Sequence, residues 1–305
     1  MAIENRKARS LMMKLITMKV RQIFTGLMGG DADIESMDRS RRKIDSMELQ
    51  RRKRKGTVMR KKTLGGVPVE VTAGVGCKTD DLILYLHGGA FTLGIFSQHR
   101  RYAEALTLYA HCPVIMPDYA LAPENPFPSG LDDCYKVYQY LRASHRGSRI
   151  IVMGDSAGAN YALSLTLRLK ANGEELPDRL VLHDPVIDLS GKLDHSINES
   201  INNDFMVTLS MGEFLQKTYI QDSDPTNYEI SPIYGDLSGF PPTFITCESH
   251  ETLYADSLEL DRMLEAVSVP VKTIVLDGSF HTYATLGDAT IETKKITKDI
   301  IDFIN

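Results

Sequence analysis

Short apolar runs alternate with longer, mixed stretches along most of the chain after Gly56. The apolar runs predict strands at 57–63, 67–71, 82–86, 114–116, 150–153, 180–182, 243–246 and 271–275, the first two joined as a hairpin by Leu64-Gly65-Gly66. The stretches between most of the others predict helices at 102–109, 132–143, 160–171 and 252–266. This alternation predicts an α/β fold with a mostly parallel sheet, covered by helices on both faces. Catalytic loops are then expected at the carboxyl ends of the strands.

The first 60 residues have a different pattern, in which apolar residues recur at three- and four-residue steps. One such stripe predicts a helix that ends near Gly29-Gly30 and a second stripe predicts another helix; their apolar positions are Met12, Ile16, Val20, Ile23 and Leu27, and Ile34, Met37, Ile44 and Met47. Stripes of this kind are usually packing faces. These helices are therefore expected to fold onto the rest of the protein.

Charge is unevenly distributed between these two parts of the chain. Residues 1–62 contain 18 Lys and Arg against 7 Asp and Glu, and the remainder contains 17 against 33. One interpretation is a basic arm that binds an anionic surface or nucleic acid. The other, which we favour, is a solvated helical face matched against the acidic body, because Phe24 is the only aromatic residue of the arm and nucleic-acid platforms need several.

A serine flanked by glycines follows one of the predicted strands. The segment Gly154-Asp155-Ser156-Ala157-Gly158 lies between the strand at 150–153 and the helix at 160–171. A strand, a sharp turn and a helix in this order form a nucleophile elbow, whose strained backbone pushes the serine hydroxyl outward. Ser156 is therefore the candidate nucleophile, and Asp155 is interpreted as a hydrogen-bonding strut.

A second glycine-containing segment, His87-Gly88-Gly89-Ala90, follows the strand at 82–86. Glycines leave backbone N–H groups accessible, and such groups can stabilise a negatively charged oxygen. The candidate donors of this oxyanion hole are the N–H groups of Gly88, Gly89, Ala90 and Ala157. Taken alone, the segment could also be a turn that ends a strand, which is the less favoured interpretation.

Several motifs occur together in a specific order: His87 to Ala90, Tyr119-Ala120-Leu121-Ala122-Pro123-Glu124, Phe127-Pro128 through Asp133, the Ser156 elbow, Ser231-Pro232, and 236–242 with its proline pair. In this order and spacing they resemble the hormone-sensitive-lipase-like family of α/β-hydrolase esterases. The resemblance covers roughly residues 65–305 and implies the α/β-hydrolase fold. In that fold the catalytic residues follow one another in the order serine, acid, histidine.

The base and the acid are expected downstream of Ser156. His281 follows the strand at 271–275, where the fold places its base, and is preferred over His183, His195 and His250. The acid departs from the commonest family pattern, because Glu251 stands two residues before Leu253 where most relatives carry an aspartate. Asp256 remains the alternative acid, although its place inside the following helix would turn it away from the strand end.

The resemblance also implies a helical cap over the active site. We expect residues 1–55 and 191–224 to form this cap, and 56–190 and 225–305 to form the core. The cap cavity is expected to have an adaptable lining of methionines, namely Met12, Met13, Met18, Met206 and Met211.

The implied activity is hydrolysis of small esters with short to medium acyl chains, through an acyl-enzyme intermediate on Ser156. The mechanism requires no metal and no organic cofactor. Two alternatives remain open: a non-catalytic small-ligand-binding protein on the same fold, and an amidase or peptidase. The presence of His281 argues against the first, and nothing in the sequence shows the extra aid that the poorer leaving group of an amide needs.

Cellular context is predicted from cysteines and from missing targeting signals. The four cysteines show no metal-ligand or disulfide spacing, which favours free thiols in a reducing compartment. The sequence has no secretion signal and no stretch of membrane-spanning length. We therefore expect a cytoplasmic enzyme without nucleic-acid partners or stable membrane insertion. A homodimer is one oligomeric state that the sequence leaves open.

Overall fold

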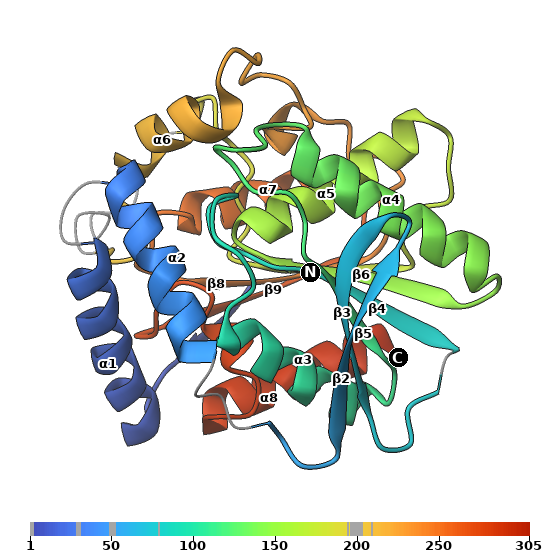
Figure 1. Ribbon diagram of the computed structural model, residues 1–305, viewed down its shortest axis with the longest axis horizontal. Coiled ribbons are helices and arrows are strands. Elements are labelled where there is room, and N and C mark those ends of the chain that lie inside the picture. Colours follow the sequence, from blue (N-terminus) through green and yellow to red (C-terminus); the bar gives the residue numbers. More distant parts are fainter. Residues whose placement is uncertain are drawn as a thin grey trace.

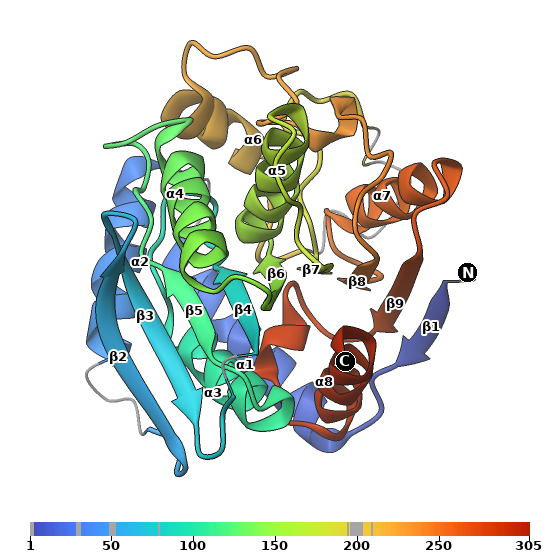
Figure 2. The same ribbon diagram turned by 90° about the vertical axis from the view of Figure 1, so that its right-hand side faces the viewer.

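The computed structural model describes residues 3–28, 32–48, 53–78, 80–193, 195, 204–208 and 210–305. A nine-stranded sheet with the order β1-β9-β8-β7-β6-β4-β5-β3-β2 runs through the molecule (Figure 2). Its strands are β1 (Glu4–Lys7), β2 (Thr57–Leu64), β3 (Val67–Gly74), β4 (Asp81–Leu86), β5 (Val114–Pro117), β6 (Arg149–Asp155), β7 (Arg179–His183), β8 (Thr243–Glu248) and β9 (Val271–Asp277).

The sheet is parallel except at one edge. Every pair from β1 through β9, β8, β7, β6 and β4 to β5 is parallel, whereas β3 is antiparallel to β5 and β2 is antiparallel to β3. The β2–β3 hairpin turns at Gly65 and Gly66, both of which have positive φ. The prediction of a mostly parallel α/β sheet is therefore confirmed, and each predicted strand matches an observed one to within three residues at either end.

Helices cover both faces of the sheet. In Figure 1, α4 (Ser129–Ser144), α5 (Ala157–Ala171) and α7 (Tyr254–Ala266) lie above it, and α3 (Ser97–Ala110) and α8 (Ile291–Ile304) lie below it. Side chains of a strand alternate between the faces, so Leu82 and Leu84 pack with the upper layer and Ile83 and Tyr85 with the lower one. Burial on both faces explains why the central strands are continuously apolar.

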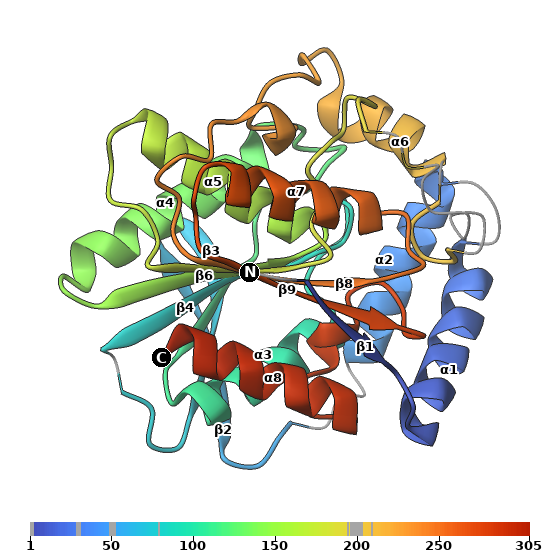
Figure 3. The ribbon, with the colours of Figure 1, turned by 180° about the vertical axis from the view of Figure 1, so that it is seen from behind.

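The N-terminal part forms two helices, as its apolar stripes predict. α1 (Leu11–Met28) and α2 (Ile34–Glu48) stand beside the sheet, together with the short α6 (Ser210–Leu215), on the side toward which β9 points (Figure 3). Glycines 29 and 30, at the predicted end of the first helix, lie outside the described residues. α1 is fixed at its start by Glu292, which accepts the Ser10 N–H at 2.7 Å and the Ser10 hydroxyl at 2.7 Å.

Several elements of the fold were not predicted, among them β1 and α8. β1 is a polar segment, Glu-Asn-Arg-Lys, that adds to the edge of the sheet by pairing in parallel with β9. An edge strand of this kind has no apolar alternation to reveal it. α8 does carry a regular apolar face, with Ile296, Ile300 and Ile304 buried against the lower layer.

Candidate active site

Ser156 occupies the turn between β6 and α5. Its backbone has φ of 53° and ψ of −122°, an unusual conformation for a residue with a side chain. The Ser156 N–H donates to the carbonyl of His183 at 2.8 Å, which holds the turn against the neighbouring strand. A Cβ at Gly154 would lie 2.4 Å from the carbonyl oxygen of Gly158, and one at Gly158 would lie 2.1 Å from that of Leu86. Gly154 is therefore required for the tight closure of the elbow on itself, and Gly158 for the close approach of the elbow to β4.

Asp155 joins the elbow to the glycine-rich loop after β4. One carboxylate oxygen accepts the Tyr85 hydroxyl at 2.5 Å and the Gly88 N–H at 2.9 Å, and the other lies 3.3 Å from Nε2 of His99. Burial alone would raise the pKa of Asp155, but His99 and these hydrogen bonds lower it below its usual value. Asp155 is thus the strut that its position in the sequence suggests.

The contact with Asp155 changes the set of oxyanion donors. The Gly88 N–H is already used by the Asp155 carboxylate, so the expectation that Gly88 donates to a substrate oxygen does not fit this geometry. The N–H groups of Gly89 and Ala90 have no acceptor among the described residues. Gly89, Ala90 and Ala157 all line the same cavity as Ser156, and Ala157 opens α5, where the first N–H groups lack intrahelical partners.

His87, at the start of this loop, has a structural environment. Its ring stacks on Tyr119 with centroids 4.1 Å apart, and Nδ1 lies 2.9 Å from the Gly88 carbonyl oxygen. Burial, together with the nearby His99, lowers the pKa of His87 to about 3. His87 is therefore a neutral side chain that packs beneath the loop.

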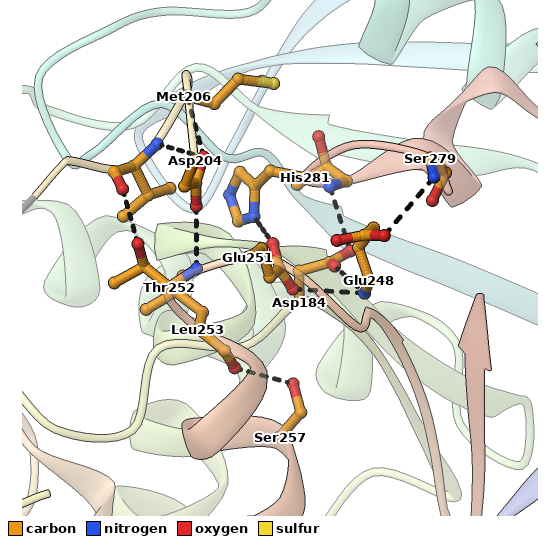
Figure 4. Close-up of polar contacts among 12 residues, drawn as sticks. Asp184, Asp204, Met206, Glu248, Glu251, Thr252, Leu253, Ser257, Ser279 and His281 are labelled. Atoms are coloured by element: carbon orange, nitrogen blue, oxygen red, sulfur yellow. Dashed lines mark hydrogen bonds and ion pairs between the residues drawn. The ribbon is translucent and has the colours of Figure 1, made fainter. Parts of the chain in front are cut away.

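His281 and Glu251 come together at the carboxyl ends of β8 and β9. Nδ1 of His281 lies 2.5 Å from Oε2 of Glu251, and both side chains are buried (Figure 4). The other ring nitrogen, Nε2, is buried and has no hydrogen-bond partner among the described residues. Because the His281 ring lines the same cavity as Ser156, this nitrogen is available to a hydroxyl proton there.

Asp184 is a second buried acidic side chain at this place, and its position in the sequence suggested no role for it. It forms a side-chain hydrogen bond with Glu251, and oxygen or nitrogen atoms of Asp184, Glu251 and His281 lie within 4.8 Å of one another (Figure 4). Its oxygens also accept the N–H groups of Glu248 and Thr282, each at 3.1 Å. Nothing in the sequence around Asp184 indicates that it reaches the acid–base pair, because β7 and β8 must first pair in register.

Burial dominates the protonation of this carboxyl pair. It raises the pKa of Asp184 well above the ordinary value, and the neighbouring Glu251 raises it further, while His281 opposes the shift. Burial also raises the pKa of Glu251, but the hydrogen bond from Asp184 opposes that effect. Two carboxylates this close disfavour each other's ionisation in a buried site, so the pair favours keeping one proton between them.

The other candidate acid, Asp256, and the other candidate bases have hydrogen-bond or ion-pair partners away from His281. Asp256 accepts the N–H groups of Ile187 and Asp188 and lies 2.7 Å from Nε2 of His195, away from His281. Tyr102 and Thr246 form hydrogen bonds with the two ring nitrogens of His183.

His250 is half exposed and lies near Glu248 and Asp277. The three residues form a second group of potential metal ligands. Glu248 also accepts the N–H groups of Gly278 and Ser279, so it anchors the loop that carries His281.

A cavity of about 530 Å³ connects these groups with the N-terminal helices. Its lining is mostly apolar and includes Val20, Ile23 and Phe24 of α1, Ile44 of α2, and Leu215 of α6. The expected methionine lining is correct for Met206 and Met211. It is wrong for the other three: Met13 is buried in the core below, and Met12 and Met18 face outward, because the inner side of α1 is formed by Val20, Ile23 and Phe24 instead.

Comparison with known proteins agrees with this architecture. A family model described as "alpha/beta hydrolase fold" matches residues 83–285. The chain is 34% identical over 224 residues to an esterase of Acinetobacter venetianus, covering 73% of this chain and 74% of that protein. It is 30% identical over 264 residues to the carboxylesterase/phospholipase LipF of Mycobacterium tuberculosis, covering 82% of this chain and 69% of that protein. A solved esterase from the bacterial hormone-sensitive lipase family superposes with a TM-score of 0.87 at 28% identity, covering 97% and 98%.

The chain therefore belongs to the α/β-hydrolase fold family. Within that family it is a member of the hormone-sensitive-lipase-like esterases, and so a carboxylesterase/lipase-like hydrolase. No described helix has both the length and the apolar character needed to cross a membrane.

Proposed function

We propose that the protein hydrolyses carboxylic esters by two-step acyl transfer on Ser156, with His281 as the base and Glu251 as the acid. The observation that carries this proposal is the buried contact of 2.5 Å between Glu251 and His281, whose second nitrogen is unpartnered among the described residues and lies beside the cavity of the serine elbow. A carboxylate on Nδ1 fixes the tautomer in which Nε2 accepts a proton.

The mechanism follows from these positions. His281 takes the hydroxyl proton of Ser156 as the oxygen attacks the ester carbonyl. The N–H groups of Gly89, Ala90 and Ala157 then stabilise the oxyanion, and His281 returns the proton to the departing alcohol. Water repeats the sequence on the acyl-enzyme and releases the acid. Ser156 stays poised for this reaction because Asp155 holds the elbow and the oxyanion loop in one arrangement.

Asp184 serves as a positioning residue in this proposal. Protonated, it donates to Glu251, which leaves the second carboxylate oxygen of Glu251 oriented toward His281. The N–H groups of Glu248 and Thr282 fix the orientation of Asp184 in turn. The extra methylene of a glutamate, compared with the aspartate of most relatives, is thereby held in a single rotamer by contacts on both oxygens.

Residues 1–55 and 191–224 act as the cap in this proposal, although 1–2, 29–31, 49–52, 194, 196–203 and 209 lie outside the described residues. Support comes from the cavity lining, to which both segments contribute apolar side chains. A cavity of about 530 Å³ suits a small ester with a short to medium acyl chain. A soluble, cytoplasmic enzyme remains our prediction from the sequence, and its oligomeric state is open.

The experiment that tests the proposal is a panel of p-nitrophenyl esters and matched anilides, assayed with wild type and Ser156→Ala. We expect turnover of the shorter esters by wild type, negligible turnover of the anilides, and loss of ester turnover in the variant. Undiminished activity of Ser156→Ala would refute the assignment of the nucleophile. Binding of esters without turnover by wild type would favour the ligand-binding alternative, and anilide hydrolysis at comparable rates would favour an amidase.

A further inference from the structure

The outward side of α1 is apolar as well as its inward side. Leu11, Met12, Leu15 and Met18 are exposed by 71%, 54%, 48% and 56%. They are four of the twelve large apolar side chains exposed among the described residues, gathered within eight positions of one helix. Scattered exposed apolar residues are ordinary, but a cluster of them usually marks a surface that binds something.

Basic residues flank this cluster on both sides. At 3.6 residues per turn, Leu11, Leu15 and Met18 follow one line along the helix, with Lys14 and Arg21 on one side of it and Lys19 on the other. α1 contains no Asp or Glu. Lys14 and Lys19 are exposed, and neither forms an ion pair with any residue in the described part of the chain. The outward side of α1 is therefore an apolar strip with positive margins.

Other basic residues of the N-terminal part behave differently. Arg6 pairs with Asp299, Arg41 with Glu124 and Arg54 with Asp288, all at 2.6 Å. For these residues the interpretation of a basic part matched against an acidic body is correct. It does not extend to the two lysines of α1, whose positive charge remains directed at solvent.

We propose that the outward side of α1 docks the protein on the surface of an anionic lipid bilayer. Leu11, Leu15 and Met18 would enter the boundary between headgroups and acyl chains, while Lys14 and Lys19 contact the anionic headgroups. The helix lies on the membrane and does not span it, consistent with its three charges and with the finding that no described helix can cross a membrane. The charge pattern decides against a second copy as the occupant, since a twofold pairing of α1 would oppose lysines and arginine with their own copies.

Docking at α1 has a consequence for the proposed esterase. The inward side of the same helix supplies Val20, Ile23 and Phe24 to the cavity. The helix thus separates the docked surface from the cavity by its own width, about 10 Å. Apolar esters that partition into the bilayer would then be delivered close to Ser156.

Co-sedimentation with vesicles tests the proposal directly, using the full chain and no substrate. Vesicles of phosphatidylcholine alone are compared with an equimolar mixture of phosphatidylcholine and phosphatidylglycerol, at low and at high salt. We expect binding to the anionic vesicles at low salt and its loss at high salt or without phosphatidylglycerol. Lys14→Gln/Lys19→Gln should weaken binding roughly thirtyfold, at about 1 kcal/mol for each basic residue.

The apolar strip is tested by Leu11→Gln/Leu15→Gln/Met18→Gln, which keeps helix propensity and removes apolar surface. This variant should lose at least about tenfold in affinity for the anionic vesicles. Val58→Gln/Val75→Gln and Lys62→Gln/Lys78→Gln are matched controls on exposed positions of β2 and nearby loops, and both should bind as wild type does. All four variants should hydrolyse a soluble short-chain ester at the wild-type rate.

Two results would overturn the docking proposal. One is a wild-type protein that does not bind the anionic vesicles at low salt, or α1 variants that bind them as tightly as wild type does. The other is a wild-type dimer in light scattering that becomes a monomer in the triple glutamine variant without any vesicle binding, which would assign the strip to a second copy. The esterase proposal fails separately: wild type would then bind vesicles but would not hydrolyse soluble esters.

Discussion

Replacing Asp184 by asparagine tests the buried carboxyl pair through the pH dependence of stability. In the unfolded chain an aspartate loses its proton near pH 3.9. In the folded protein, burial and the adjacent Glu251 raise the pKa of Asp184 well above that value, so the native state keeps a proton that the unfolded state has lost. The contribution of Asp184 to the unfolding free energy of wild type therefore falls as pH rises above the unfolded pKa, until the folded pKa is reached.

The magnitude follows from this linkage. Each pH unit in which one extra proton stays on the native protein lowers the unfolding free energy by about 1.4 kcal/mol. An asparagine side chain cannot ionise, so the stability of Asp184→Asn relative to wild type should rise between pH 5 and pH 7, by at most about 2.7 kcal/mol and only over the pH units in which native Asp184 keeps its proton. The amide also loses one acceptor for the N–H groups of Glu248 and Thr282, a cost of about 1–3 kcal/mol that does not vary with pH.

Urea unfolding followed by circular dichroism, at half-unit steps of pH, measures this difference. Asp288→Asn is the control, because the hydrogen bond from Arg54 lowers the pKa of Asp288 and both of its states are ionised throughout this range. The difference in unfolding free energy between Asp288→Asn and wild type should not change with pH. A flat difference for Asp184→Asn as well would show that Asp184 is ionised in the native protein, and would refute the shared proton.

Three further substitutions test the site. Glu251→Gln should lower kcat by about 10³–10⁴ with the fold intact, since an amide cannot fix the same imidazole tautomer. Asp256→Asn should change kcat by less than about tenfold, and reversed effects of the two variants in the same assay would move the acid to Asp256. Gly158→Ala should lower the unfolding free energy by about 1–3 kcal/mol or more, because its Cβ would overlap the Leu86 carbonyl oxygen. Gly212→Ala, with open space around it, should not lower it, and equal thermal stability of the two variants would contradict the close packing of the elbow. Asp155→Asn should reduce kcat as well as stability, because it weakens the link between the elbow and the Gly88 loop, and an unchanged kcat would show that the link has no part in catalysis.

The architecture could be predicted because its signals are local. The apolar runs of the central strands, such as 82–86 and 150–153, are long enough to be recognised, and the motif order from His87 to Gly158 is specific. β1 escaped prediction because an edge strand of four polar residues gains its stability from backbone pairing with β9, which no side-chain pattern records.

The residues of the candidate site could be proposed from the sequence, but their contacts could not. Ser156, Glu251 and His281 follow from motif positions, and the structure brings the last two together beside the cavity of the first. The use of the Gly88 N–H by Asp155, and the contact of Asp184 with Glu251, arise only when β4, β6, β7 and β8 lie side by side. The outward exposure of Met12 and Met18 likewise depends on which side of α1 packs on the body.

The account depends most on Ser156 being the residue that is acylated. Its most direct test is mass spectrometry of the protein after reaction with a fluorophosphonate, with peptide mapping of the adduct and a parallel assay of ester turnover. We predict one adduct per chain, on Ser156, formed in step with the loss of turnover and absent from Ser156→Ala. An adduct on another residue, or full turnover by protein whose Ser156 is completely modified, would contradict the account.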